Sequence, residues 1–142
     1  MRTIKTLSLD DAKKGLEAME KKAKDLSVEV CFCIVDGTNN ILILERMDDC
    51  KIHSINLARA KATTAVSLRN STGANGKWVR EMGIDIAYWA GACETGFMGG
   101  IPVYSDKKET APIGAIGVSC GTLEQDEEIA LTGIKAMGFI TK

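Results

Sequence analysis

The sequence lacks three features that would each point to a particular class of protein. It has no hydrophobic run near the roughly 20 residues that a membrane-spanning helix needs. Its first ten residues carry Arg2, Lys5 and Asp10 and lack the apolar segment of a signal peptide. Its 18 basic and 19 acidic residues give a net charge of −1, and no stretch gathers the basic ones. We therefore expect a cytoplasmic protein whose partners are neither membranes nor nucleic acids.

Residues that bind metals are also scarce or scattered. The only histidine is His53, whereas a zinc site built from protein groups needs three or four ligands. The five cysteines are odd in number and follow no disulfide framework, so we expect free thiols in a reducing compartment. These cysteines are Cys31, Cys33, Cys50, Cys93 and Cys120.

What the chain does have is the composition of an ordinary globular protein. It contains 142 residues, of which 45% are hydrophobic and 26% charged. This length and balance suffice for one hydrophobic core without cross-links. We expect a single domain over residues 1–142.

The order of predicted elements indicates the fold class. A first helix begins after Ser8. A last helix begins after Thr122, which forms a capping box with Gln125 three residues later, and it stops at Gly138. The strands predicted between these helices form two hairpins, and hairpins imply an antiparallel sheet. The pattern therefore predicts an α+β domain with helices packed on that sheet. The intervening elements are strands at 28–35 and 41–45, an alanine-rich helix at about 54–68, and strands at 101–104 and 113–119.

The strand at 28–35 is expected to be central in the sheet because both of its faces are mostly apolar. By contrast, residues 70–76 should break the alanine-rich helix, and residues 77–100 are the hardest to interpret. A short helix around 77–82 is expected there, and a long irregular stretch is often a binding loop. This stretch holds Trp78, Trp89, Tyr88, Phe97, Met82 and Met98 with Gly83, Gly91, Gly96, Gly99 and Gly100.

Two residues at the alanine-rich helix are candidates for catalysis. His53 stands just before the helix, where it can ligate a metal or haem iron or transfer protons; the alternative is a cap or surface histidine. Lys61 shares a helical row with Ser54 and other small residues, so its amine either points into a pocket, where burial activates it, or extends to solvent from the helix edge. The pocket is favoured mainly by the family resemblance described below.

Three further motifs have a functional and a structural interpretation. Arg46 after a strand can bind a carboxylate, although an internal Arg–Asp pair that braces its loop is favoured. Cys31 and Cys33 share a strand face, where buried small hydrophobic side chains are favoured over a soft-metal site. Gly99, Gly100 and Ile101 open a strand, where the glycines allow tight packing or close approach of a ligand to the backbone.

These pieces, in this order, resemble the GlcG/HbpS-like family, also called the haem-degrading or PduO C-terminal-like domain. The resemblance spans Ser8 to Gly138 and implies a profilin-like fold with an antiparallel sheet of about five strands, assembled as homo-oligomers. It also implies haem or corrinoid-related binding in some members and lyase activity in others. The matching motifs are Asp36, Arg46-Met47-Asp48, Ser54 with Ala60-Lys61-Ala62, Gly99 to Val103, Gly114 to Ser119, and Gln125-Asp126-Glu127.

Three functions stay open at this point. The first is a domain that binds a small ligand, haem or a related planar cofactor. The resemblance implies a histidine ligand from the first helix in some haem-binding members, and this chain has none there. Either His53 replaces it, or haem binds through an oxygen ligand or not at all. The second is a lyase or isomerase in which Arg46 holds a carboxylate and His53 or Lys61 moves a proton, with Ser54 nearby. The third is an accessory domain for assembly. The ligand set for the first comprises Arg46, Ser54, Gly99, Gly100 and Ile101, with His53 as the metal ligand.

Overall fold

The computed structural model describes residue 1, residues 3–88 and residues 93–142. Trp89 and Gly91, which belong to the stretch that the sequence left open, lie outside these described residues.

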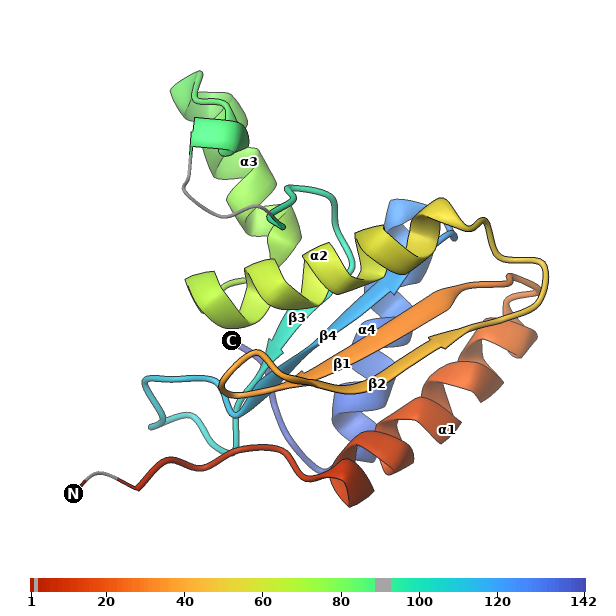
Figure 1. Ribbon diagram of the computed structural model, residues 1–142, viewed down its shortest axis with the longest axis horizontal. Helices are drawn as coiled ribbons and strands as arrows, with labels where there is room; N and C mark the ends of the chain where they lie inside the picture. Colours follow the sequence, from red (N-terminus) through yellow and green to blue (C-terminus); the bar gives the residue numbers. More distant parts are fainter. Residues whose placement is uncertain (2, 89–92) are drawn as a thin grey trace.

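The sheet has four strands, all paired antiparallel, in the order β2-β1-β4-β3. Helices α1 and α4 pack together on one face, and α2 runs across the other (Figure 1). The α+β class and the antiparallel sheet are thus confirmed. The strands are β1 (Cys31–Asp36), β2 (Ile41–Arg46), β3 (Gly100–Val103) and β4 (Gly114–Ser119), and the three helices are α1 (Leu9–Asp25), α2 (His53–Leu68) and α4 (Leu123–Ala136).

The expected count of about five strands is wrong for the described residues, which form four. Among the described residues, one isolated bridge continues the edge beyond β3, in which Tyr104 and Ile140 exchange backbone hydrogen bonds. The chain before β3 does not supply another strand, because its described part forms α3 (Thr72–Met82) and the short 3-10 helix η1 (Ile86–Tyr88) instead.

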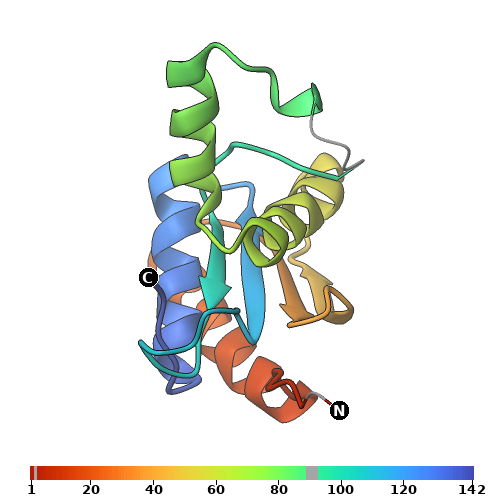
Figure 2. The same cartoon turned by 90° about the vertical axis from the view of Figure 1, so that its left-hand side faces the viewer.

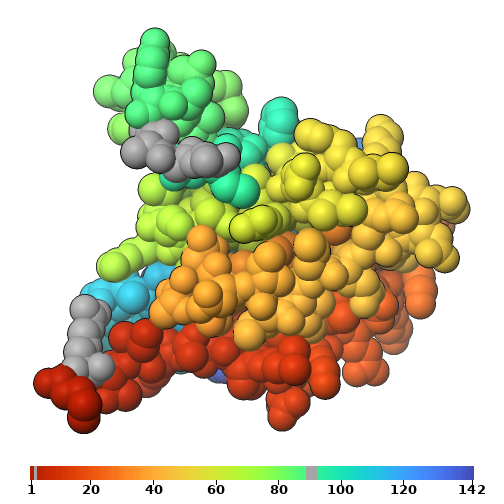
Figure 3. All heavy atoms as spheres, in the orientation of Figure 1, coloured from red at the N-terminus to blue at the C-terminus, as the bar shows by residue number. Residues whose placement is uncertain are grey.

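Helix α3 also begins earlier than the sequence predicts, within the residues expected to break the preceding helix. The Ser71 side chain accepts a hydrogen bond from the Ala74 N–H and so caps a new helix. The glycines in its first turns have a steric role, because a Cβ at Gly76 would overlap the backbone of Gly96. Figures 2 and 3 show this helix and the chain after it standing out from the body of the protein.

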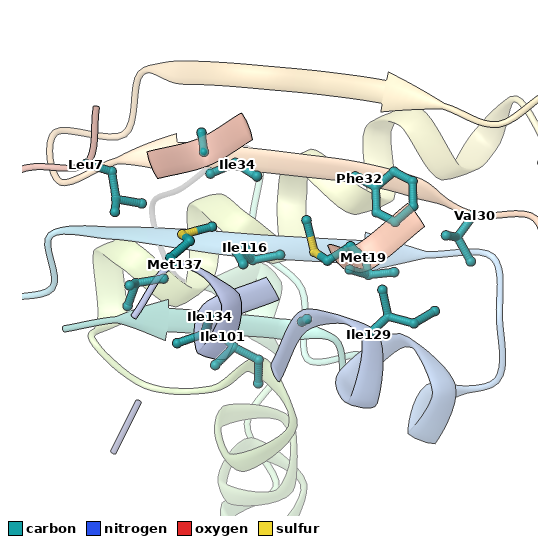
Figure 4. Packing of buried hydrophobic residues seen from close by; sticks show 14 of the residues in the cluster. Leu7, Met19, Val30, Phe32, Ile34, Ile101, Ile116, Ile129, Ile134 and Met137 are labelled. Carbon is teal, nitrogen blue, oxygen red and sulfur yellow. The ribbon is translucent and has the colours of Figure 1, made fainter. Parts of the chain in front are cut away.

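Alternate residues of β1 face the two sides of the sheet, as the sequence predicts. Phe32 and Ile34 pack between the sheet and helices α1 and α4 (Figure 4), whereas Cys33 faces α2. The α2 side is built from small residues so that helix and sheet can approach closely. A Cβ at Gly117 of β4 would overlap the carbonyl of Ala58 in α2. The thicker of the two cores therefore lies on the α1–α4 side, away from α2.

The turn between β1 and β2 is organised by the Asp36 carboxylate. It accepts hydrogen bonds from the backbone N–H of Thr38 (2.8 Å) and Asn40 (3.0 Å) and from both of their side chains. Burial alone would raise the pKa of this carboxyl, but the bonds from Asn40 and Thr38 hold the pKa below its ordinary value. The ionised form of Asp36 therefore stabilises the hairpin.

We predict that Asp36→Ala lowers the free energy of unfolding by about 1–3 kcal/mol, because these bonds go to a charged group. Since the folded-state pKa is depressed, the contribution is present above the ordinary carboxyl pKa and is lost as the pH falls through the folded-state value. Urea unfolding at several pH values measures it. Asp25→Ala, at the exposed end of α1, is the matched control; an equal loss in both variants, or one independent of pH, would contradict this role.

Candidate functional site

A pocket of about 260 Å³ opens where α2 begins, β4 ends and α4 begins. Three residues that the sequence singled out, His53, Ser54 and Lys61, line it together. All three belong to α2, whose first turns lie over the end of β4 (Figure 1). The rest of the lining is Lys51, Leu57, Phe97, Ser119, Cys120, Gly121, Leu123 and Asp126.

The floor of the pocket holds a buried ion pair. Lys61 Nζ lies 2.7 Å from Asp126 Oδ2 and also donates to the carbonyl oxygen of Val118 at 2.7 Å. The two charged side chains are only 1% and 2% exposed. The other carboxylate oxygen of Asp126 accepts the Gly121 N–H at 2.9 Å. Through these bonds α2, on one face of the sheet, is joined to α4, on the other, past the end of β4.

Each partner compensates the cost of burying the other. Burial lowers the pKa of the Lys61 amine, and the hydrogen bond and charge of Asp126 oppose that change. Burial likewise raises the pKa of the Asp126 carboxyl, while Lys61 and the Gly121 N–H oppose it. Because a buried charge without a partner costs several kcal/mol, removing either group is far more damaging than removing both.

Gly99 and Gly100 make room for this pair. Gly99 has φ +109°, and a Cβ there would lie 2.8 Å from Asp126 Cβ and 3.1 Å from Lys61 Nζ. A Cβ on Gly100 would overlap the Lys61 carbonyl and the Thr72 methyl group. Both glycines are therefore required for packing around the ion pair, which matches one of the two interpretations that the sequence left open.

Of the residues predicted for the site, Arg46 and Ile101 lie outside the pocket lining, and His53 stands at its edge. His53 is exposed on the first turn of α2, and no side chain caps that turn. Ile101 is buried in the core on the other side of the sheet, near Ile134 (Figure 4). Arg46 is not among the lining residues; its guanidinium donates to the carbonyls of Asp48 (3.1 Å) and Cys50 (2.6 Å). Arg46 thus braces its own loop through backbone carbonyls.

Sequence reasoning missed Asp126, Cys120 and Phe97. In the sequence, Asp126 is one of several acidic residues at the start of the last helix. A signal for its burial exists, because it precedes Ile129, Ala130 and Gly133 on the buried face of α4. Cys120 and Phe97 stand in irregular segments, where periodicity carries no information. Among the residues that the structure describes, no three histidine, cysteine or acidic side chains converge to hold a metal ion.

A second cavity, of about 510 Å³, lies between α3 and the segment that returns from it. Its apolar lining includes Val79, Ile84 and Ile86, and Phe97 forms part of its wall as well as of the first pocket. The second cavity has no histidine in its lining, because the one histidine of the sequence, His53, lines the first pocket. The exposed surface of the protruding region also carries three large apolar side chains, Trp78, Met82 and Tyr88.

The fold is that of an α+β domain with an open pocket beside a buried lysine. Residues 7–135 match the family described as "Haem degrading protein HbpS-like", so the chain belongs to this family. No helix in the described ranges is long and apolar enough to cross a bilayer.

Relatives of known sequence cover nearly the whole chain. It is 37% identical over 142 residues to an uncharacterized 15.0 kDa protein from the dhaT–dhaS intergenic region of Citrobacter freundii, with 92% of each covered. It is also 31% identical to the corrinoid adenosyltransferase PduO of Citrobacter freundii, in a match that covers 96% of this chain. The match spans only 40% of PduO, so this chain is similar to one part of that protein.

Solved structures agree with this assignment. The ORFY protein of Klebsiella pneumoniae superposes with a TM-score of 0.89 at 31% identity, covering 97% of this chain and 94% of ORFY. A PduOC:heme complex superposes with a TM-score of 0.84 at 31% identity, covering 96% and 98%. A double mutant of HbpS from Streptomyces reticuli gives 0.83 at 26% identity, covering 95% and 89%.

We predict that Lys61→Met lowers the free energy of unfolding by about 3–5 kcal/mol, because it leaves the Asp126 carboxylate buried without its partner. Asp126→Leu should be similarly destabilising, and the double variant less so than either. In Lys61→Met the pKa of Asp126 rises further, so the penalty is absent below the ordinary carboxyl pKa and grows as the pH rises through the folded-state value.

Chemical denaturation of the four proteins of this double-mutant cycle measures the coupling. The surface pair between Lys22 and Glu128, at 2.6 Å, supplies the control, because Lys22→Met should cost no more than about 1 kcal/mol. Additive losses for the two buried substitutions would show that the pair is not a unit.

Proposed function

We propose that this protein binds haem, or a related planar cofactor, across the pocket beside His53, with the His53 imidazole as the ligand to its metal. The observation that carries the proposal is the combination of one exposed imidazole with apolar side chains around an open pocket. Phe97 is 57% exposed and Leu123 is 41% exposed, and Leu57 completes the apolar rim. A flat hydrophobic ligand would remove this surface from water.

The residues present fit such a ligand at the rim. The pocket volume of about 260 Å³ is just below the roughly 300–1,000 Å³ of typical small-molecule sites. A porphyrin would therefore lie across the opening with part of its surface uncovered. Lys51, an exposed cation beside His53, is placed to pair with a propionate. Bound haem would supply an iron centre whose reactivity depends on its axial ligand.

The comparisons support the same ligand class. The family to which the chain belongs is described as haem degrading, and the PduOC structure, at 31% identity, is a haem complex. The larger cavity under α3 is a weaker candidate, since it offers no imidazole to the iron. Assembly as homo-oligomers remains a prediction, and a partner chain over the open pocket would cover the exposed part of the ligand.

The lyase or isomerase alternative has less support. It requires Arg46 to clamp a carboxylate near the proton-transferring group, but the Arg46 guanidinium is engaged with the carbonyls of Asp48 and Cys50. Of its two candidate proton-transferring groups, His53 and Lys61, the Lys61 amine is already held by Asp126 and Val118. We assign Lys61 a positioning role, in which it fixes the floor of the pocket.

Haemin titration followed by the Soret band tests the proposal. We expect a sharp, saturable Soret band for the wild-type protein. In His53→Ala the band should shift and the affinity for haemin should fall at least about tenfold, because the axial ligand is lost. Phe97→Ala should also weaken binding through lost apolar contact.

Tyr88→Ala is the matched control, because Tyr88 is an exposed aromatic residue outside the pocket lining, and its binding curve should equal that of the wild type. A saturable Soret band unchanged in His53→Ala would remove His53 as the ligand. A broad, non-saturating spectrum in the wild type would remove haem itself.

A further inference from the structure

Two cysteines that are distant in the sequence lie side by side at the edge of the pocket. The Sγ of Cys120 accepts the backbone N–H of Lys51, the residue after Cys50, at 3.4 Å. The Sγ of Cys50 lies 3.9 Å from the carbonyl oxygen of Ser119, the residue before Cys120. Each sulfur thus contacts the backbone next to the other cysteine, so the two thiols face one another.

The two thiols differ in access and in backbone conformation. Cys50 is 3% exposed, whereas Cys120 is partly exposed and lines the pocket, so a reactant in the pocket meets Cys120 first. Cys120 also has φ +108°, a region that residues with a side chain rarely adopt. Strained backbone of this kind persists only where the surroundings hold it, and it is concentrated at functional sites.

The electrostatic environment shifts the pKa values of the two thiols in opposite directions, which also favours Cys120 as the reactive one. Burial acts to raise the pKa of Cys120, but the Lys51 N–H, Ser54 and Cys50 outweigh it and hold the pKa below its ordinary value. Burial raises the pKa of Cys50 to about 12, and the hydrogen bond and charge of Cys120 add to that rise. Cys120 is therefore the better nucleophile, and Cys50 gains acidity once Cys120 no longer carries a charge.

We propose that Cys120 and Cys50 form a redox-active dithiol, in which Cys120 attacks a small disulfide that enters the pocket and Cys50 resolves the product. The Cys120 thiolate forms a bond to one sulfur of the disulfide RSSR, and RS⁻ leaves. The Cys50 thiol then loses its proton, attacks the Cys120 sulfur and expels the second RS⁻. Two protein thiols are oxidised to one disulfide, RSSR is reduced, and the two protons pass to the two RS⁻ groups.

The bond would tie the chain just before α2 to the end of β4. His53 follows Cys50 by three residues, so oxidation would fix the approach to the pocket at the point where its exposed imidazole stands. This inference does not depend on haem binding. It requires only that the two sulfurs are neighbours and that one of them is reached from the pocket.

Peptide mapping after oxidation tests the pairing directly. Reduced wild-type protein is incubated with oxidised glutathione, remaining thiols are alkylated, and trypsin is added. The cleavage sites place Cys50 in peptide 47–51, Cys120 in 109–135, Cys93 in 81–107 and both strand cysteines in 25–46. We expect the dominant cross-link to join 47–51 to 109–135, and dithiothreitol to reverse it.

Two variants identify the order of events. In Cys50→Ser, glutathione should remain attached to Cys120, because the resolving thiol is gone. Cys93→Ser, in which a partly exposed cysteine of another region is removed, should form the 50–120 link at the wild-type rate. The proposal is overturned if native wild-type protein gives no such link, if Cys50 joins Cys31 instead, or if the link forms equally well in denaturant.

Discussion

The rest of the structure depends on one contact, the ion pair between Lys61 and Asp126. A four-stranded sheet that carries helices on both faces normally separates those helices completely. Here Lys61 of α2 reaches past the end of β4 and meets Asp126 of α4 at 2.7 Å. The left-handed backbone at Gly99 and the carbonyl of Val118 lie against that amine, and the missing side chain of Gly100 leaves room for the Lys61 backbone. Neither core alone would fix the relative position of α2 and α4 so closely.

The same contact explains why the pocket stands where it does. Its floor is polar but internally satisfied, so it presents little free charge to a ligand, and its rim is largely apolar. A ligand is then selected by the groups at the opening, His53, Lys51 and Phe97, more than by the floor. An interpretation of Lys61 as a nucleophile overlooks its two hydrogen-bond partners, which hold the amine in place.

The sequence predicts most of the fold because local patterns determine it. The capping groups at Ser8 and Thr122 and the alternation in β1 are contained within a few residues, and each is confirmed. Helical spacing alone leaves Lys61 either inward or at the helix edge, and the family resemblance favours the inward position. The sequence cannot name the partner of Lys61, since that partner is 65 positions away and resembles its acidic neighbours. The predictions of a fifth strand and of the start of α3 were wrong, because both features depend on what a glycine-rich segment packs against.

The position of Phe97 joins two parts of the protein that otherwise share few contacts. Its ring lines the pocket beside His53 and also the larger cavity beneath the protruding α3. One side chain is therefore a common wall, and space gained by one cavity when the ring turns is lost by the other. A molecule against α3 that moved this ring would therefore also change the shape of the opening beside His53, and a ligand beside His53 that moved it would change the cavity under α3.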